Sequence, residues 1–326
     1  MTRTPLRISL GGGGTDLPSY YREFGGFVIS AAISKYVYIT INKSFLPGYF
    51  LKYSEAEHAE TRSEIRHPLM REALEMHDIL KPLEIVSLAD VPAGTGLGSS
   101  GTFLVGLMHA LHAYKRESVT PELLAREAID VEMNRLEEPV GKQDQYIAAY
   151  GGLLCQEYHE DNTVTLQPLR IAEETIRELR DSLMLFFVGR TRNASTLLSD
   201  QKRRSQAGDT DMLNGLHFTK QLGREIRAIL ESGRTSDLGE LMHEHWLRKR
   251  SRSADMSNSR IDDLYELARN EGGARGGKLV GAGGGGFFLF QTEDRRRLRD
   301  VMTRAGLNEM DFTFDFDGSV VLIRNA

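Results

Sequence analysis

The sequence predicts an α+β protein built from two domains. A chain of 326 residues is longer than a single simple core requires. Its first part is rich in strand-like segments, whereas helical patterns dominate from about residue 190 onward. Because the character changes near residues 185–190, we place the boundary there and expect domains at 1–187 and 188–326.

In the first domain, β-branched and aromatic residues in alternating or continuous apolar runs predict strands. These strands cover residues 6–10, 27–42 and 83–89. Helical spacing of apolar residues predicts helices at 68–79 and 101–115. Thr120 as N-cap and Pro121 at the first helical position predict another helix that runs to about Leu136.

In the second domain, the short apolar run at 183–188 predicts a buried strand. Helical patterns follow at about 194–206, 211–231, 236–250, 259–271 and 293–305. A pair of strands at 277–280 and 286–291 flanks a glycine cluster, and residues 319–324 predict a final strand.

The composition is that of a soluble globular protein, with 27% charged and 40% hydrophobic residues. A net charge of −5 gives no support to a nucleic-acid partner. The single cysteine, Cys155, excludes an intrachain disulfide and indicates a reducing compartment. Apolar runs of membrane-spanning or signal-peptide type are absent, so we expect a cytoplasmic protein without a membrane partner.

Many of the 32 glycines fall into three clusters, at 11–14, 94–101 and 272–286. The middle one lies in PAGTGLGSSG, residues 92–101, between a predicted strand and a predicted helix. Free N–H groups and the dipole at a helix N-terminus attract anions. Ser99 and Ser100 supply hydroxyls for phosphate or Mg²⁺. A plain turn needs one or two glycines rather than four, so this cluster predicts a phosphate site.

Two other nucleotide motifs fit less well. Gly96, Gly98 and Gly101 match the dinucleotide pattern G-x-G-x-x-G, but the acidic residue expected about 20 positions later on a second strand is missing. Gly272, Gly277 and Lys278 match the start of a P-loop. Leu279 follows where a Mg²⁺-binding Ser or Thr is required, which excludes that motif.

Three motifs in order resemble the GHMP kinases, the family of galactokinase, homoserine kinase, mevalonate kinase and phosphomevalonate kinase. They are TPLRISLGGGGTDLPSYY at 4–21, PAGTGLGSS at 92–100 and KLVGAGGGGFFLF at 278–290. The resemblance implies a two-domain fold, with a left-handed β-α-β unit in the N-terminal ATP-binding domain and a ferredoxin-like C-terminal domain. It also places the active site between the domains.

Within the family, LGGGGTDLPSYYREFGGFVISAAI and GKQDQYIAAYGG resemble the kinases of higher-carbon sugar phosphates. That likeness implies ATP-dependent phosphorylation of the anomeric hydroxyl of a D-glycero-α-D-manno-heptose 7-phosphate or an octose 8-phosphate, by a monomer or homodimer. A kinase of an unphosphorylated sugar of the fucose or galactose type, and a non-catalytic sugar or ATP sensor, are the alternatives.

The resemblance also implies roles for individual residues. Asp144 in GKQDQ would be the catalytic carboxylate, and Arg7 would lie beside it. Ser100 and Glu132 would hold Mg²⁺, which prefers a few hard oxygen ligands. The implied ATP-binding residues are Pro92, Gly94, Gly96, Leu97, Gly98, Ser99, Ser100 and Gly101.

For the acceptor, Asp16 matches the family's sugar-binding aspartate, with a helix N-cap as the rival role. The glycines at 12–14 replace the Glu-His pair of galactokinases, which opens space and argues against galactose. His243 and His245 face apart on a helix and are interpreted as structural. The full set of predicted substrate-binding residues is Gly13, Gly14, Thr15, Asp16, Arg192, Lys249, Lys278, Gly283 and Gly284.

Overall fold

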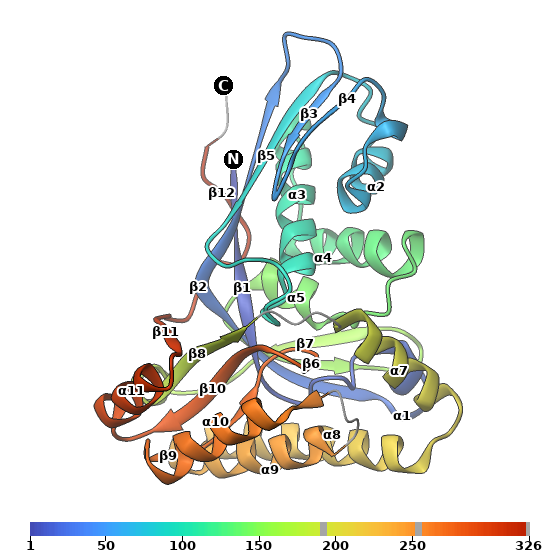
Figure 1. Ribbon diagram of the computed structural model, residues 1–326. Helices are drawn as coiled ribbons and strands as arrows, with labels where there is room; N and C mark the ends of the chain where they lie inside the picture. The colour runs from blue at the N-terminus through green and yellow to red at the C-terminus, as the bar shows by residue number, and fades with distance from the viewer. Residues whose placement is uncertain (190–193, 252–255, 324–326) are drawn as a thin grey trace.

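The computed structural model describes residues 1–189, 194–251 and 256–323, and it contains two β-sheets with helices packed around them (Figure 1). The larger sheet has eight strands and the smaller one has four. Strands β3, β4 and β5 of the larger sheet lie with α2 in the upper part of Figure 1, its strands β6 and β7 lie lower beside α7, and helices α8 and α9 lie along the base. The α+β class and the two-domain organisation are confirmed.

The larger sheet is organised around β2, which is 18 residues long. Along its length β2 pairs with β1, while its first part also pairs with β6 and its last part with β5. The strand order is β12-β1-β2-β5-β3-β4, with β7 beside β6, and β3 runs parallel to β5. The strands of this sheet are β1 (Thr2–Gly11), β2 (Gly26–Lys43), β3 (Tyr49–Lys52), β4 (Ala56–Ala59), β5 (Leu83–Ala89), β6 (Leu153–Tyr158), β7 (Val164–Pro168) and β12 (Val320–Val321).

Helix α3 forms the centre of the first domain's core. Its side chains are apolar or small nearly all the way round, and most of them are buried, which is typical of a helix enclosed by protein. At Gly106 a Cβ would lie 2.9 Å from Thr4 Oγ1, so the glycine lets α3 approach β1 closely. The helices of this part are α1 (Pro18–Phe24), α2 (Pro68–Met76), α3 (Ser99–Lys115), α4 (Pro121–Ile129), α5 (Gln143–Tyr150) and α6 (Glu173–Ser182), with short turns η1 (Arg62–Glu64) and η2 (Asp130–Arg135).

The smaller sheet has the order β11-β8-β10-β9 and carries an aromatic core. Trp246 and Tyr265 pack against Phe288, with ring centroids 6.1 and 5.8 Å from it. The elements of this part are β8 (Leu183–Gly189), α7 (Ala194–Gln206), α8 (Thr210–Glu231), η3 (Thr235–Asp237), α9 (Leu238–Arg250), α10 (Ser259–Asn270), β9 (Ala274–Leu279), β10 (Gly286–Thr292), α11 (Arg295–Arg304) and β11 (Asn308–Met310).

The chain crosses between the two sheets twice. The boundary predicted after residue 187 falls inside β8, which pairs with β10 and β11 of the smaller sheet. Later the chain returns to the larger sheet, where Asp315 N donates to Ala32 O at 3.0 Å and β12 pairs with β1. We therefore propose a boundary before β8, with residues 313–321 grouped with the N-terminal domain.

The long predicted helices and strands are present, but several short elements were not predicted. β3 and β4 have only four residues each, too few to show a period. The sequence analysis also lacked α1, α5, α6, β6, β7 and β11. The predicted last strand is shorter than expected: only Val320 and Val321 pair, and the exposed Leu322 and Ile323 lie beyond the ladder.

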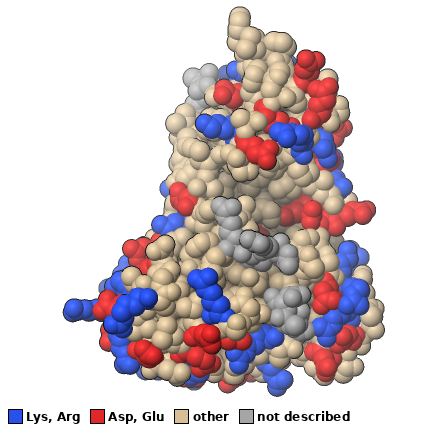
Figure 2. Space-filling model, in the orientation of Figure 1, with Lys and Arg blue, Asp and Glu red and all other residues tan. Residues whose placement is uncertain are grey.

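Within the described residues, we find no helix that combines the length and the apolar character needed to cross a membrane. On the face shown in Figure 2, basic and acidic side chains are interspersed over both parts of the molecule.

Trp246 anchors the core of the smaller sheet, and its replacement tests how much this core contributes to stability. Its side chain is 0% exposed, so we expect Trp246→Ala to lower the free energy of unfolding by about 3–5 kcal/mol. The neighbouring Leu247 is 38% exposed, and Leu247→Ala should change stability by no more than about 0.5 kcal/mol. Urea unfolding of both variants measures the difference, and equal effects would contradict this assignment of the core.

Candidate active site

The glycine-rich segment 92–101 ends at the N-terminus of α3. Gly98 is the N-cap residue with φ +79°, and glycine has no side chain with which to cap the helix. The Ser99 hydroxyl oxygen is buried and has no hydrogen-bond partner among the described residues. The first turn of α3 therefore offers backbone N–H groups and a hydroxyl to an anion.

Arg7 and Asp144 form a two-point ion pair beside this loop. Arg7 lies on β1, and Asp144 is in the first turn of α5. Arg7 Nε and Nη2 donate to the two carboxylate oxygens of Asp144 at 2.7 and 2.9 Å. Arg7 Nη1 donates to Gly96 O at 2.6 Å. Bidentate pairs of this kind fix orientation as well as charge, so Asp144 is held in one position.

Glycines in the loop are what allow Asp144 to lie so near. A Cβ at Gly98 would lie 3.1 Å from both Arg7 Cγ and Asp144 Cγ. At Gly101 a Cβ would lie 2.9 Å from Asp144 Cβ. Larger residues at these positions would separate the phosphate loop from α5, so the glycine pattern sets the distance between donor site and carboxylate.

Glu132 lies on the π-helical turn η2, which continues α4. The side chain is 2% exposed and accepts a hydrogen bond from Gln145 Nε2 at 2.6 Å. The pKa of Glu132 is raised to about 7, chiefly by burial and also by the nearby charge of Asp144, while interactions with Ser100 and Gln145 oppose the shift. The buried carboxylate and the hydroxyl of Ser100 are thus in contact, and this donor set fits Mg²⁺.

Asp16 lies at the base of a cavity of about 110 Å³ between the two domains. Its Oδ1 accepts from Gly14 N at 3.1 Å, and its Oδ2 accepts from Gln143 N at 3.2 Å. Burial, and secondarily the charge of Asp144, raise the pKa of Asp16. The rival N-cap role is wrong, because Leu17 is the N-cap of α1 and Asp16 instead joins the glycine loop to α5.

The third glycine cluster packs directly on the phosphate loop. A Cβ at Gly281, which has φ +85°, would lie 2.4 Å from Gly96 Cα. The Lys249 ammonium donates to Leu279 O at 3.2 Å and also to Gly281 O. The backbone-to-backbone contact between Gly281 and Gly96 joins the smaller domain to the glycine-rich segment 92–101 without any intervening side chain.

Lys278 is buried behind this contact. Its Nζ donates to Leu10 O at 3.0 Å and lies 3.3 Å from His245 Nδ1. Burial lowers the pKa of Lys278 well below its ordinary value, and the charges of Lys249 and Arg7 lower it further. A bound anion would oppose this shift.

The structure brings together most, but not all, of the predicted substrate residues. The cavity wall contains Arg7, Gly13, Gly14, Asp16, Asp144 and Lys249. Thr15 is directed inward instead, and its hydroxyl donates to Gly12 O and Phe27 O. Gly283 and Gly284 contact Met256, which itself lines the cavity. Arg192 lies outside the described residues.

Sequence reasoning missed four polar residues of the cavity wall: Ser9, Gln143, Gln201 and His245. Ser9 and Gln143 belong to motifs that were recognised, so a closer reading of polar residues within those motifs could have found them. Gln201 on α7 donates to Gly14 O at 2.9 Å, and no motif marked it. His243 and His245 do face apart: His243 contacts Tyr265, and His245 reaches the cavity.

The raised pKa of Glu132 predicts a specific pH dependence of stability. The group is protonated in both states below its ordinary pKa of 4.5, and folding takes up a proton between pH 4.5 and 7. Above pH 7 the ionised carboxylate costs about 3 kcal/mol. Without divalent metal, the Glu132→Gln variant and the original protein should have the same free energy of unfolding near pH 4.5. As the pH rises to 8, the variant should become the more stable of the two.

Urea unfolding across this pH range measures the effect. Glu137→Gln is the control, because Glu137 is an exposed carboxylate near the same turn and its loss should leave the pH profile unchanged. Parallel profiles for Glu132→Gln and the original protein would contradict the raised pKa.

Two family models and several known proteins match this sequence. The family model for the GHMP kinase N-terminal domain matches residues 65–152, and that for the GHMP kinase C-terminal domain matches residues 226–308. D-glycero-alpha-D-manno-heptose 7-phosphate kinase of Campylobacter jejuni is 29% identical over 97% of this chain and 95% of that protein. The bifunctional fucokinase/GDP-fucose pyrophosphorylase of Arabidopsis thaliana is 26% identical over 92% of this chain and 30% of that protein.

A solved structure shows the same architecture. The crystal structure of a D-glycero-D-manno-heptose 1-phosphate kinase from Bacteroides thetaiotaomicron superimposes with a TM-score of 0.79. It is 24% identical and covers 98% of this chain and 97% of its own. With both family domains matched in order and the fold shared along the whole chain, this protein belongs to the GHMP kinases, phosphotransferases with an alcohol group as acceptor.

Proposed function

We propose that this protein transfers the γ-phosphoryl group of ATP to the anomeric hydroxyl of a higher-carbon sugar phosphate. D-glycero-α-D-manno-heptose 7-phosphate is the first candidate acceptor, and an octose 8-phosphate is the second. The observation that carries the proposal is the Arg7–Asp144 pair, held at 2.7 Å between the N-terminus of α3 and the interdomain cavity. The similarity to the Campylobacter jejuni heptose 7-phosphate kinase supports the class of acceptor.

The donor half of the site binds and orients phosphates. Backbone N–H groups at the start of α3 and the hydroxyl of Ser99 would donate to phosphate oxygens. Ser100 and Glu132 would hold Mg²⁺, and the bound metal ion would supply charge neutralisation to the phosphates. Ionised Glu132 is the binding form, so a pKa of about 7 implies that metal affinity falls as the pH is lowered through neutrality.

Asp144 would act on the attacking hydroxyl. Its carboxylate is 22% exposed toward the cavity, so an acceptor there could donate its hydroxyl proton to it. Arg7 is almost fully buried and spans Asp144 and Gly96 O, so it fixes the carboxylate relative to the loop. Because the transition state of phosphoryl transfer is loose, such positioning supplies most of the catalysis.

The acceptor half would use hydrogen bonds at one end and cations at the other. Asp16 and Gln143 are bonded to one another and would contact sugar hydroxyls. Among the described residues, Lys249 on the cavity wall and the buried Lys278 are our proposed partners for a distal phosphate. The predicted third cation, Arg192, lies outside the described residues.

Asp144→Asn tests the catalytic assignment. Removing the proton-accepting charge should lower kcat by about 10²–10⁴-fold, while ATP binding, measured by calorimetry, should persist. Asp161→Asn is the control, since Asp161 is an exposed residue in the turn between β6 and β7, and its turnover should be unchanged. Near-original turnover by Asp144→Asn would refute the assignment.

A screen of acceptors tests the substrate class. ADP release is measured with heptose 7-phosphate, octose 8-phosphate, fucose and galactose, and NMR of the product locates the new phosphate. We expect turnover of a sugar phosphate with the phosphate added at C1. Turnover of galactose or fucose but of neither sugar phosphate would overturn the proposed class. ATP and sugar binding without any turnover would instead favour the sensor.

A further inference from the structure

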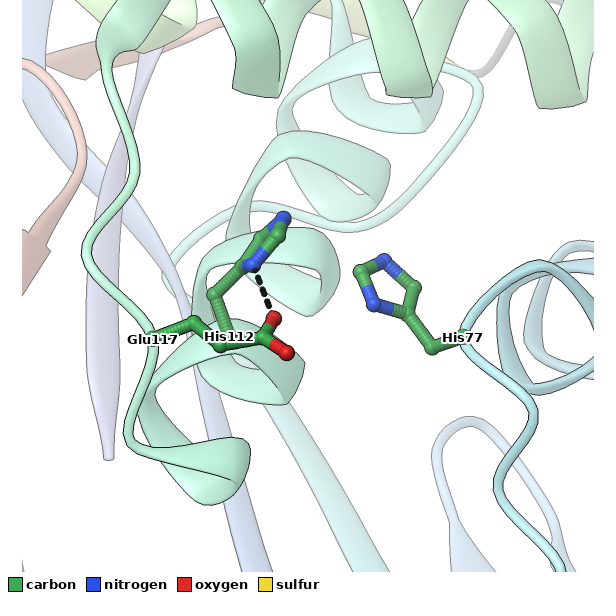
Figure 3. Close-up of side chains that lie close together, drawn as sticks. All are labelled: His77, His112 and Glu117. Atoms are coloured by element: carbon green, nitrogen blue, oxygen red, sulfur yellow. Dashed lines mark hydrogen bonds and ion pairs between the residues drawn. The ribbon is translucent and has the colours of Figure 1, made fainter.

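Two histidines and a glutamate meet at the far end of α3, away from the interdomain cavity (Figure 3). His77 directly follows α2, His112 lies near the end of α3, and Glu117 lies two residues beyond its last residue. One ligand atom from each of the three lies within 4.8 Å of the others. His112 is 13 residues after Ser99, or about 20 Å along the helix, so these side chains play no part in the proposed phosphoryl transfer.

Both ring nitrogens of His112 face carboxylates. Nδ1 lies 2.8 Å from Glu117 Oε2, and Nε2 lies 2.9 Å from Glu127 Oε2 on α4. A histidine that binds metal through one nitrogen almost always has its other nitrogen bonded to a carboxylate or carbonyl, which orients the ring. Glu127 already occupies that second position for His112.

The other two side chains differ in exposure. His77 is 6% exposed, and its ring meets that of His112 edge to face with centroids 4.8 Å apart. Glu117 has a side chain that is 42% exposed. The cluster therefore has two buried imidazoles on the protein side and a carboxylate open to solvent, by which an ion could enter.

We propose that His77, His112 and Glu117 bind a Zn²⁺ ion, with Glu127 orienting His112. Two imidazoles and one carboxylate form a ligand set that zinc uses, with a water completing the tetrahedron. Mg²⁺ prefers oxygen ligands alone, so this site and the one at Ser100 and Glu132 select different metals.

Zinc binding requires a limited rearrangement. Ligand atoms of a tetrahedral zinc site are roughly 3.3 Å apart, whereas the three here are spread over as much as 4.8 Å. Glu117 is the side chain that can adjust, because it lies on the exposed connection after α3. Its carboxylate now pairs with the partly exposed Lys115 at 2.9 Å. The ion would lie between His112 Nδ1 and the Glu117 carboxylate, in place of their present hydrogen bond.

Such a site would join α2, α3 and α4. His77 follows α2, His112 is on α3, and α4 contributes Glu127. Five residues after Glu127, the same helical segment carries Glu132. The zinc ion would therefore fix the helix that leads into the magnesium-binding turn.

Calorimetric titration of ZnCl₂ into the EDTA-treated full chain, with excess Mg²⁺ present, tests the site. We expect one saturable site per chain, weakened at least tenfold in His77→Ala and in Glu117→Gln. Glu127→Gln should weaken it by about 10–100-fold. The matched control is His58→Ala, because His58 is an exposed histidine outside the cluster, and its zinc affinity should not change.

Replacing Zn²⁺ by Co²⁺ gives a second readout, since a four-coordinate site of this kind should show visible absorption that is lost in His77→Ala. Circular dichroism checks that each variant is folded, and Glu117→Gln, at an exposed position, keeps the test valid if His77→Ala unfolds. The proposal is overturned if no saturable binding occurs, if Glu117→Gln binds zinc as tightly as the original chain, or if binding is lost in His58→Ala.

Discussion

The candidate site depends on the hydrogen bonds made by the guanidinium group of Arg7. It uses two N–H donors on Asp144 and a third on Gly96 O, while the Arg7 backbone N–H donates to Leu97 O at 3.1 Å. One residue thus connects β1, the phosphate loop and α5. A lysine would keep the charge but would lose the planar fork that holds both Asp144 oxygens at once. The glycines at 98 and 101 serve the same arrangement, because only the absence of a side chain lets the loop lie against Asp144.

The site is built at a cost to stability. Glu132, Asp16 and Lys278 are ionisable groups that are at most 2% exposed, and burial disfavours the charged form of each. Their partners are chiefly neutral amides, hydroxyls and backbone groups, which compensate a buried charge less well than a counter-ion would. Such unfavourable placements concentrate where a charged ligand is to be received. The anions and cations of a bound nucleotide and metal would supply the missing charges.

Much of the fold could be predicted because the long elements carry strong periodic patterns, as in α3 and β2. Short strands such as β3 and β4 could not, since four residues do not establish a period and their pairing is decided by β5. Asp144 was predicted because the segment around it resembles a family motif. Its neighbour Gln143 was not, because its contact with Asp16 depends on how α5 meets the glycine loop. The spacing of His243 and His245 showed that they face apart. Which of them reaches the cavity is set by the burial of Trp246 in the neighbouring core.

The return of the chain to its first sheet has a consequence for biosynthesis. Residues 313–321 bond to Ala32, Gly152 and β1, so the larger sheet lacks a neighbouring segment until these residues, which follow the whole smaller sheet in sequence, have been synthesised. The strands of the smaller sheet are all available before that point. Although domains commonly fold in order from the N-terminus, the smaller domain can here reach its final pairing first. The completed phosphate loop, which rests on both β1 and Gly281, would then be among the last parts of the molecule to become ordered.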